Sequence, residues 1–130
     1  MQSKTVREQL YPHSSKQKTP RKIFFEATSE QEIFDFTKWL EKKLTREEQK
    51  SLYNLLRGCC SHTEMALHHN SEKFRLEFDG IFALKDFQTR LYGYHEGVNF
   101  IVFHYMKKKK GRLSKSEKEV LRRKYKECKR

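Results

Sequence analysis

Residues 99–110 read Asn99-Phe100-Ile101-Val102-Phe103-His104-Tyr105-Met106-Lys107-Lys108-Lys109-Lys110, an apolar stretch that runs directly into four lysines. The apolar density of its first eight residues is typical of a central strand covered on both faces. The lysines stand where such a strand leaves its sheet, so a rigid sheet edge would hold their charge in place. The segment therefore predicts a sheet core with a basic surface beside it.

Positive charge is concentrated at the two ends of the 130-residue chain. Residues 105–130 hold 13 Lys and Arg against three Glu, and residues 1–22 hold six basic residues against one acidic residue. Residues 23–104 carry a small net negative charge, and the whole chain has a net charge of +12. A charge run alone is more often a solvated tail, but a run that follows a buried strand and continues into a basic helix favours phosphate binding.

The composition favours one small cytoplasmic domain. A chain of this length can bury a single two-layer core, and ten Phe and six Tyr supply much of its apolar area. No apolar run approaches the roughly 20 residues of a membrane span, and the first residues lack the apolar segment of a signal peptide. Three cysteines without a framework spacing fit a reducing compartment. We therefore expect a cytoplasmic protein without a membrane partner.

The cysteines and histidines between residues 59 and 69 raise the question of a metal site. The candidates are Cys59, Cys60, His62, His68 and His69. Adjacent cysteines on a helix point about 100° apart, and the spacing matches no familiar zinc pattern. Basic segments without a carboxylate cluster also disfavour a two-metal nuclease. We expect ordinary thiols and solvated histidines, and no metal or cofactor.

The first half of the chain predicts an arm, a strand and two helices. Residues 1–20 are polar and contain two prolines, so we expect a flexible basic arm followed by one domain over residues 21–130. A strand at residues 22–27 precedes two capping boxes, Ser29-x-x-Glu32 and Thr45-x-x-Glu48, which each open a helix with apolar residues at helical spacing. Two helices with so short a connection form an αα-hairpin.

After about residue 70 the apolar period changes to two, as in strands. Asp79-Gly80, Asp86-Phe87 and Glu96-Gly97 offer tight turns between these strands, so we expect an antiparallel meander. Ser114-x-x-Glu117 then opens a last, basic helix. The predicted fold is an α+β domain in β-α-α-β-β-β-α order. We expect a small antiparallel sheet with the αα-hairpin on one face, and we expect the last helix on that same face.

One face of the predicted strand at residues 88–94 carries a polar and aromatic set: Gln88, Arg90, Tyr92 and Tyr94. Arginine binds phosphate in a bidentate fork, and a tyrosine ring can stack on a base, so this face could be a nucleotide platform. Alternatively, Tyr92 or Tyr94 caps the core under a helix and Arg90 extends past it to solvent. His104 and Tyr105 point to opposite faces of the next strand, so only one of them can join the platform.

Three segments in this order resemble the C-terminal half of the RelE/ParE toxin superfamily, closest to its phage-derived, HigB-like branch: Ala83-Leu84-Lys85, Thr89-Arg90-Leu91 and Phe103-His104-Tyr105-Met106-x-Lys108-Lys109. That branch has roughly Glu-Leu-Arg, a Tyr-Arg pair, and Leu-His-Gly-Phe-x-Lys-Lys before its final helix. Here Ala83 and Lys85 replace the Glu and Arg, and Tyr105-Met106 replaces Gly-Phe. The resemblance extends over about residues 22–126.

The resemblance implies a toxin of a type II toxin-antitoxin system. Such toxins are typically metal-independent, ribosome-dependent mRNA endonucleases, so the implied partners are mRNA on the ribosome and a cognate antitoxin, often of helix-turn-helix type. Two alternatives remain open. One is a non-enzymatic nucleic-acid-binding module, and the other is a gyrase-directed toxin of ParE type.

Cleavage of RNA through its own 2′-hydroxyl requires positive charge on the phosphate and groups that transfer protons. Lys85 and Arg90 are the candidates for the phosphate, and His104 or Tyr105 for proton transfer. A lysine within the basic run could also act in acid–base chemistry, because like charges lower its proton affinity. The residues expected to bind RNA are Tyr92, Tyr94, Lys107, Lys108, Lys109, Lys110 and Arg112.

Overall fold

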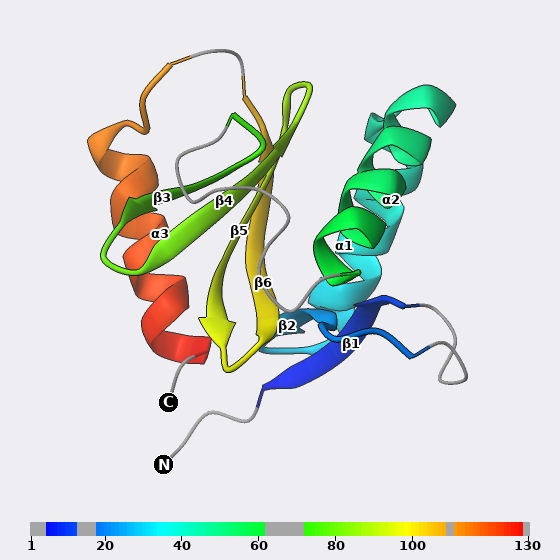
Figure 1. Cartoon of the computed structure of the whole chain (residues 1–130). Helices are drawn as coiled ribbons and strands as arrows, with labels where there is room; N and C mark the ends of the chain where they lie inside the picture. The colour runs from blue at the N-terminus through cyan, green and yellow to red at the C-terminus, as the bar shows by residue number, and fades with distance from the viewer. Residues whose placement is uncertain (1–4, 13–17, 62–71, 109–110, 129–130) are drawn as a thin grey trace.

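A six-stranded mixed sheet runs through the computed structural model, which describes residues 5–12, 18–61, 72–108 and 111–128 (Figure 1). In chain order the elements are β1 (Val6–Tyr11), β2 (Ile23–Ala27), α1 (Glu30–Lys43), α2 (Arg46–Cys60), β3 (Phe74–Phe78), β4 (Ile81–Asp86), β5 (Thr89–Glu96), β6 (Asn99–Lys107) and α3 (Lys115–Cys128). The α+β class is as predicted, but the sheet is larger than the predicted order allows.

The spatial order of the strands is β1-β2-β6-β5-β4-β3. Strands β3 to β6 form the predicted antiparallel meander, and the first hairpin turns through Asp79 and Gly80 at φ values of 49° and 79°. β2, however, pairs with β6 in parallel. The sheet is therefore mixed, and the purely antiparallel prediction is wrong. Two parallel strands need a long crossover connection, and here the chain between residues 27 and 99 forms it.

The prediction of a flexible arm is wrong for residues 6–11, because these residues form β1. This strand pairs with β2 along its length, and Tyr11 is fully buried, with its ring 5.4 Å from that of Tyr53. Arg7 forms ion pairs with Glu26 and Glu96. The apolar side chains of β1 were too few to stand out in a polar segment, yet they suffice for an edge strand. Residues 1–4 and 13–17 of the predicted arm lie outside the described residues.

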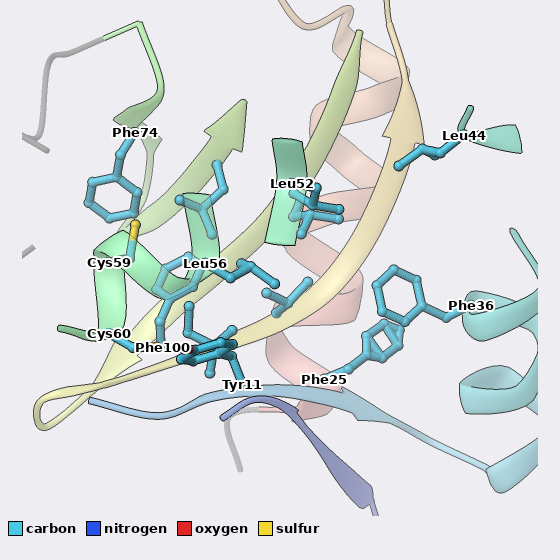
Figure 2. Packing of buried hydrophobic residues seen from close by; sticks show 14 of the residues in the cluster. Tyr11, Phe25, Phe36, Leu44, Leu52, Leu56, Cys59, Cys60, Phe74 and Phe100 are labelled. Atoms are coloured by element: carbon cyan, nitrogen blue, oxygen red, sulfur yellow. The ribbon is translucent and has the colours of Figure 1, made fainter. Parts of the chain in front are cut away.

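The αα-hairpin covers one face of the sheet, as predicted (Figure 1). Ser29 caps α1 by accepting a hydrogen bond from the Glu32 amide, and Thr45 and Glu48 form the predicted capping box of α2. The helices bury their apolar stripes against the sheet in a continuous core (Figure 2): Phe36, Leu52, Leu56, Cys59 and Cys60 pack with Phe25, Phe74, Phe100 and Val102.

Helix α3 packs on the opposite face of the sheet (Figure 1). Its fully buried Leu121 belongs to a second core with Ile101 and Phe103 of β6. The sheet is therefore covered on both faces, and the expectation that the helices share one face is wrong for α3. Within the described part of the chain, no helix is long and apolar enough to cross a bilayer.

A β-bulge sets the direction of the side chains near the end of β6. The register between β5 and β6 shifts at Gly93, where a Cβ atom would lie 2.2 Å from the carbonyl oxygen of Ile101. Because of this shift, Phe103 and His104 both contact α3, whereas Tyr105 contacts α1. Bulges re-aim side chains in this way next to functional sites.

Candidate functional site

Three neighbouring strands bring both predicted phosphate-binding residues and one of the two predicted proton-transfer residues to one face of the sheet. Lys85 of β4 lies directly opposite Arg90 of β5, and the adjacent row pairs Tyr92 of β5 with His104 of β6. Directly paired residues project to the same side of a sheet. We define the candidate site as Lys85, Arg90, Tyr92 and His104 of the sheet with Glu117 and Lys124 of α3.

Arg90 is half-buried in the candidate site, and its guanidinium is bound by backbone carbonyl groups. Its Nη1 donates to the carbonyl oxygens of Phe87, at 2.6 Å, and Thr89, at 3.1 Å. Within the described ranges, no carboxylate oxygen lies within 4.0 Å of a guanidinium nitrogen of Arg90. A guanidinium has five N–H donors. Arg90 is therefore held in place by backbone contacts while further donors can meet a phosphate.

The lysines near Arg90 are paired with carboxylates. The Nζ of Lys85 lies 3.0 Å from Glu77 Oε1, and the Nζ of Lys108 lies 3.0 Å from Glu117 Oε1. Lys107 is directed to the other side of the sheet, where its Nζ lies 2.9 Å from Glu48 of α2. The predicted lysine cluster is thus divided between two faces. Arg112 is exposed just before α3, and Lys109 and Lys110 lie outside the described residues.

His104 is a neutral imidazole at pH 7. Burial, and then the positive charge of Lys124, lower its pKa from 6.5 to about 4, although Glu117 acts in the opposite direction. The Nζ of Lys124 lies 2.9 Å from Nδ1 of the ring. An ammonium group can only donate, so Nδ1 accepts this hydrogen bond and the ring proton resides on Nε2. His104 therefore presents an N–H donor whose other ring nitrogen is coupled to a lysine.

Tyr92 and Tyr94 are part of the core beneath α3. Their exposed fractions are 2% and 3%, and the Tyr94 hydroxyl donates to Glu26 Oε2 at 3.0 Å. Burial raises the pKa of both phenols. The prediction that these rings stack on bases is wrong for this arrangement, because α3 covers the face on which they lie. The alternative prediction, that they cap the core under a helix, is confirmed.

Tyr105 does not join the candidate site. Its ring lies on the αα-hairpin side of the sheet, with centroids 4.7 Å from Phe36 and 4.8 Å from Trp39. Burial raises its pKa. Of the two residues predicted to transfer protons, the structure therefore places only His104 on the face that carries Arg90.

Sequence reasoning missed the two residues that α3 contributes. Glu117, Leu121 and Lys124 follow one another at helical spacing, and the middle one is fully buried. Such spacing places all three on one side of a helix. The signal was therefore present, but it could be used only once α3 was known to lie over the strand that carries His104.

The cysteines at the end of α2 are buried thiols. Burial raises the pKa of Cys59 to about 11 and that of Cys60 to about 12, which keeps both protonated at neutral pH. Among the described residues there is no group of three or more His, Cys, Asp or Glu side chains suited to a metal ion. His62, His68 and His69 lie outside the described residues, so the expected absence of metal stays a prediction.

Comparison with known proteins identifies no relative of this chain. No family model, no curated protein and no solved structure matches the chain. The geometry and charge of the candidate site are therefore the basis on which a function is proposed.

Proposed function

We propose that the protein is a toxin-like endoribonuclease of RelE/ParE type that cleaves mRNA on the ribosome, with the candidate site as its active centre. The observation that carries this proposal is the placement of Lys85, Arg90 and His104 in adjacent rows of one sheet face. Each of the three segments that resemble the toxin superfamily contributes one of these residues. The same resemblance suggests an antitoxin encoded beside the toxin as the regulatory partner.

Arg90 and Lys85 supply the positive charge for the reaction. Attack of the 2′-hydroxyl on the adjacent phosphorus releases the hydroxyl proton to solvent water and gathers negative charge on the phosphate oxygens in the transition state. The guanidinium of Arg90, free of carboxylates within 4.0 Å among the described residues, can donate two parallel hydrogen bonds to those oxygens. Lys85 can exchange Glu77 for the phosphate, because both are anions at the same ammonium group.

Lys124 and His104 form a proton relay suited to the leaving group. As the phosphorus–oxygen bond to the 5′-oxygen breaks, Nε2 of His104 gives its proton to that oxygen. Nδ1 takes a proton from Lys124 at the same time, across the 2.9 Å contact. The imidazole stays neutral throughout, which agrees with its lowered pKa of about 4.

A non-enzymatic RNA-binding module is the second candidate function. The placement of Tyr105 on the opposite side of the sheet favours it, because the site then has one fewer group for proton transfer. The same Arg90 contacts would still hold a phosphate. The two candidates differ in one observable, namely whether bound RNA is cut.

The chemistry of the new RNA ends tests the proposal. Cleavage by the 2′-hydroxyl leaves a 5′-hydroxyl on the downstream fragment. We expect that induction in growing cells produces new mRNA 5′ ends, mapped by primer extension, that resist an exonuclease requiring a 5′-phosphate. New ends that this exonuclease removes would contradict the 2′-hydroxyl route. Tight RNA binding without new ends would select the binding module.

A further inference from the structure

The turn between β4 and β5 carries an exposed aromatic ring at a strained position. Phe87 is 62% exposed, and its φ angle is 54°, in the left-handed region that favours glycine. A bulky side chain is uncommon there. The ring adds little to the core and does not suit the turn. Its presence therefore calls for a role outside folding.

This turn is fixed from three directions. The Phe87 carbonyl accepts from Arg90 Nη1 at 2.6 Å, and the Gln88 carbonyl accepts from the Lys108 amide at 2.8 Å. On the other side, Asp86 Oδ1 accepts from Ser51 and from Lys73, each at 3.1 Å. A ring projected from such a support loses little freedom when a ligand stacks on it.

One cation, Lys73, which is also paired with Asp86, lies near the Phe87 ring, and a second, Arg90, is bound to the backbone of Phe87. The Nζ of Lys73 lies 5.8 Å from the ring centroid, and Arg90 contacts the carbonyl of the same residue. The amide of Lys108 binds the next residue of the turn. Proteins bind unpaired nucleotides with this combination, in which a flat exposed ring takes the base and neighbouring cations take the backbone.

We propose that Phe87 stacks on an unpaired base of single-stranded RNA whose phosphate is bound by Arg90. The inference rests on the proposed function in that it assigns RNA to the candidate site. Phe87 thereby takes the stacking role that the sequence suggested for Tyr92 and Tyr94, which are buried beneath α3.

Phe34 of α1 is a matched control. It is 54% exposed, and the Nζ of Lys38 lies 5.4 Å from its ring centroid. The pocket beside it is lined by Glu8 and Glu30, which repel phosphate, and by Arg7, whose guanidinium is already paired with Glu26 and Glu96. If the loss of any exposed Phe lowers RNA affinity, substitutions at both positions will lower it. If base stacking is the cause, only substitution of Phe87 will.

The test measures binding of two probes to the full chain. One probe is a single-stranded RNA of about 12 nucleotides, and the other is inorganic polyphosphate of similar length, which has charge but no bases. Phe87→Gly should weaken RNA binding roughly ten- to 100-fold and leave polyphosphate binding unchanged. Phe87→Trp should bind RNA within about threefold of wild type, because it keeps a ring. Phe34→Ala should leave both affinities unchanged.

Thermal melts keep the result interpretable. Phe87→Gly should melt no lower than wild type, because glycine adopts a positive φ freely. Three results would overturn the inference: RNA affinity of Phe87→Gly equal to wild type, an equal loss of affinity for polyphosphate, or no RNA binding by wild type.

Cleavage is scored separately. A wild type that binds RNA through Phe87 without cutting it removes only the endonuclease, and one that cuts without using Phe87 removes only the stacking.

Discussion

At the scale of single residues, the environment of His104 decides its chemistry more than its identity does. Burial beneath α3 and the nearby Lys124 both favour the neutral ring, and Glu117 opposes them with a smaller effect. An imidazole that stays neutral well below pH 7 is suited to relaying protons rather than to holding a permanent charge. The same environment makes folding sensitive to acid.

We expect His104 to destabilise the fold as the pH falls below 6.5. Its folded pKa of about 4 lies below the unfolded value of 6.5, so the unfolded chain binds a proton that the folded site refuses. The contribution of His104 to the free energy of unfolding is therefore fully present above pH 6.5. It falls by roughly 2–3 kcal/mol as the pH declines toward 4. Urea unfolding across this range should show a steeper loss for wild type than for His104→Gln, which keeps an acceptor for Lys124. Parallel curves would contradict the assignment.

Phe87 and Tyr92 show what residue-level patterns can and cannot predict. Alternation along β5 correctly placed Arg90 and Tyr92 on one face of the sheet. It could not show that α3 covers this face, because the covering helix is more than 20 residues away in sequence. Exposure depends on such distant contacts, so alternation alone predicts a platform at the buried Tyr92 and gives no sign of the exposed Phe87.

At the scale of elements, local signals were reliable and non-local pairings were not. The Ser29, Thr45 and Ser114 caps were found because the side chain and the amide that it binds are three residues apart. The hairpin turns were found for the same reason. The parallel pairing of β2 with β6 joins residues more than 70 positions apart, and no local pattern encodes it.

Strand β1 should be essential for stability. Removing β1 deletes the fully buried Tyr11 and exposes the core residues that Tyr11 covers. It also leaves the buried Glu26 without its ion-pair partner Arg7. We expect a chain starting at Pro20 to melt roughly 10 °C or more below the full chain. A chain starting at Thr5 is the control, because it keeps every residue of β1. Equal melting temperatures for the full chain and the chain starting at Pro20 would show that β1 adds nothing to the core.

At the scale of the whole molecule, the segregated charge of the sequence is only partly available to a ligand. Lys85, Lys107 and Lys108 are paired with carboxylates that the chain-wide count of charges cannot locate. Arg90 and Arg112 have no carboxylate within 4.0 Å among the described residues. Net charge therefore predicted the class of partner that we propose, but the accessible cations had to be read from the structure.

RNA binding should be strongly dependent on salt. With about five phosphate contacts on a single strand, the logarithm of the association constant should fall with the logarithm of salt concentration at a slope of roughly −3 to −4. A titration of the single-stranded RNA over a salt series measures this slope. Arg90→Ala should make the slope shallower by roughly one contact, about 0.7. An affinity that does not change with salt would contradict phosphate binding.

The most direct test of the central claim is cleavage of message by Arg90→Ala. A charge that acts on the phosphate in the transition state contributes roughly 2–4 kcal/mol, or two to three decades in rate. After induction in cells, we expect wild type to stop growth and to produce new mRNA ends in primer extension. Arg90→Ala should do neither while melting within a few degrees of wild type. Arg57→Ala, which removes an equal charge from the exposed side of α2, should behave as wild type. An Arg90→Ala protein that still cuts message at the wild-type rate would contradict the account.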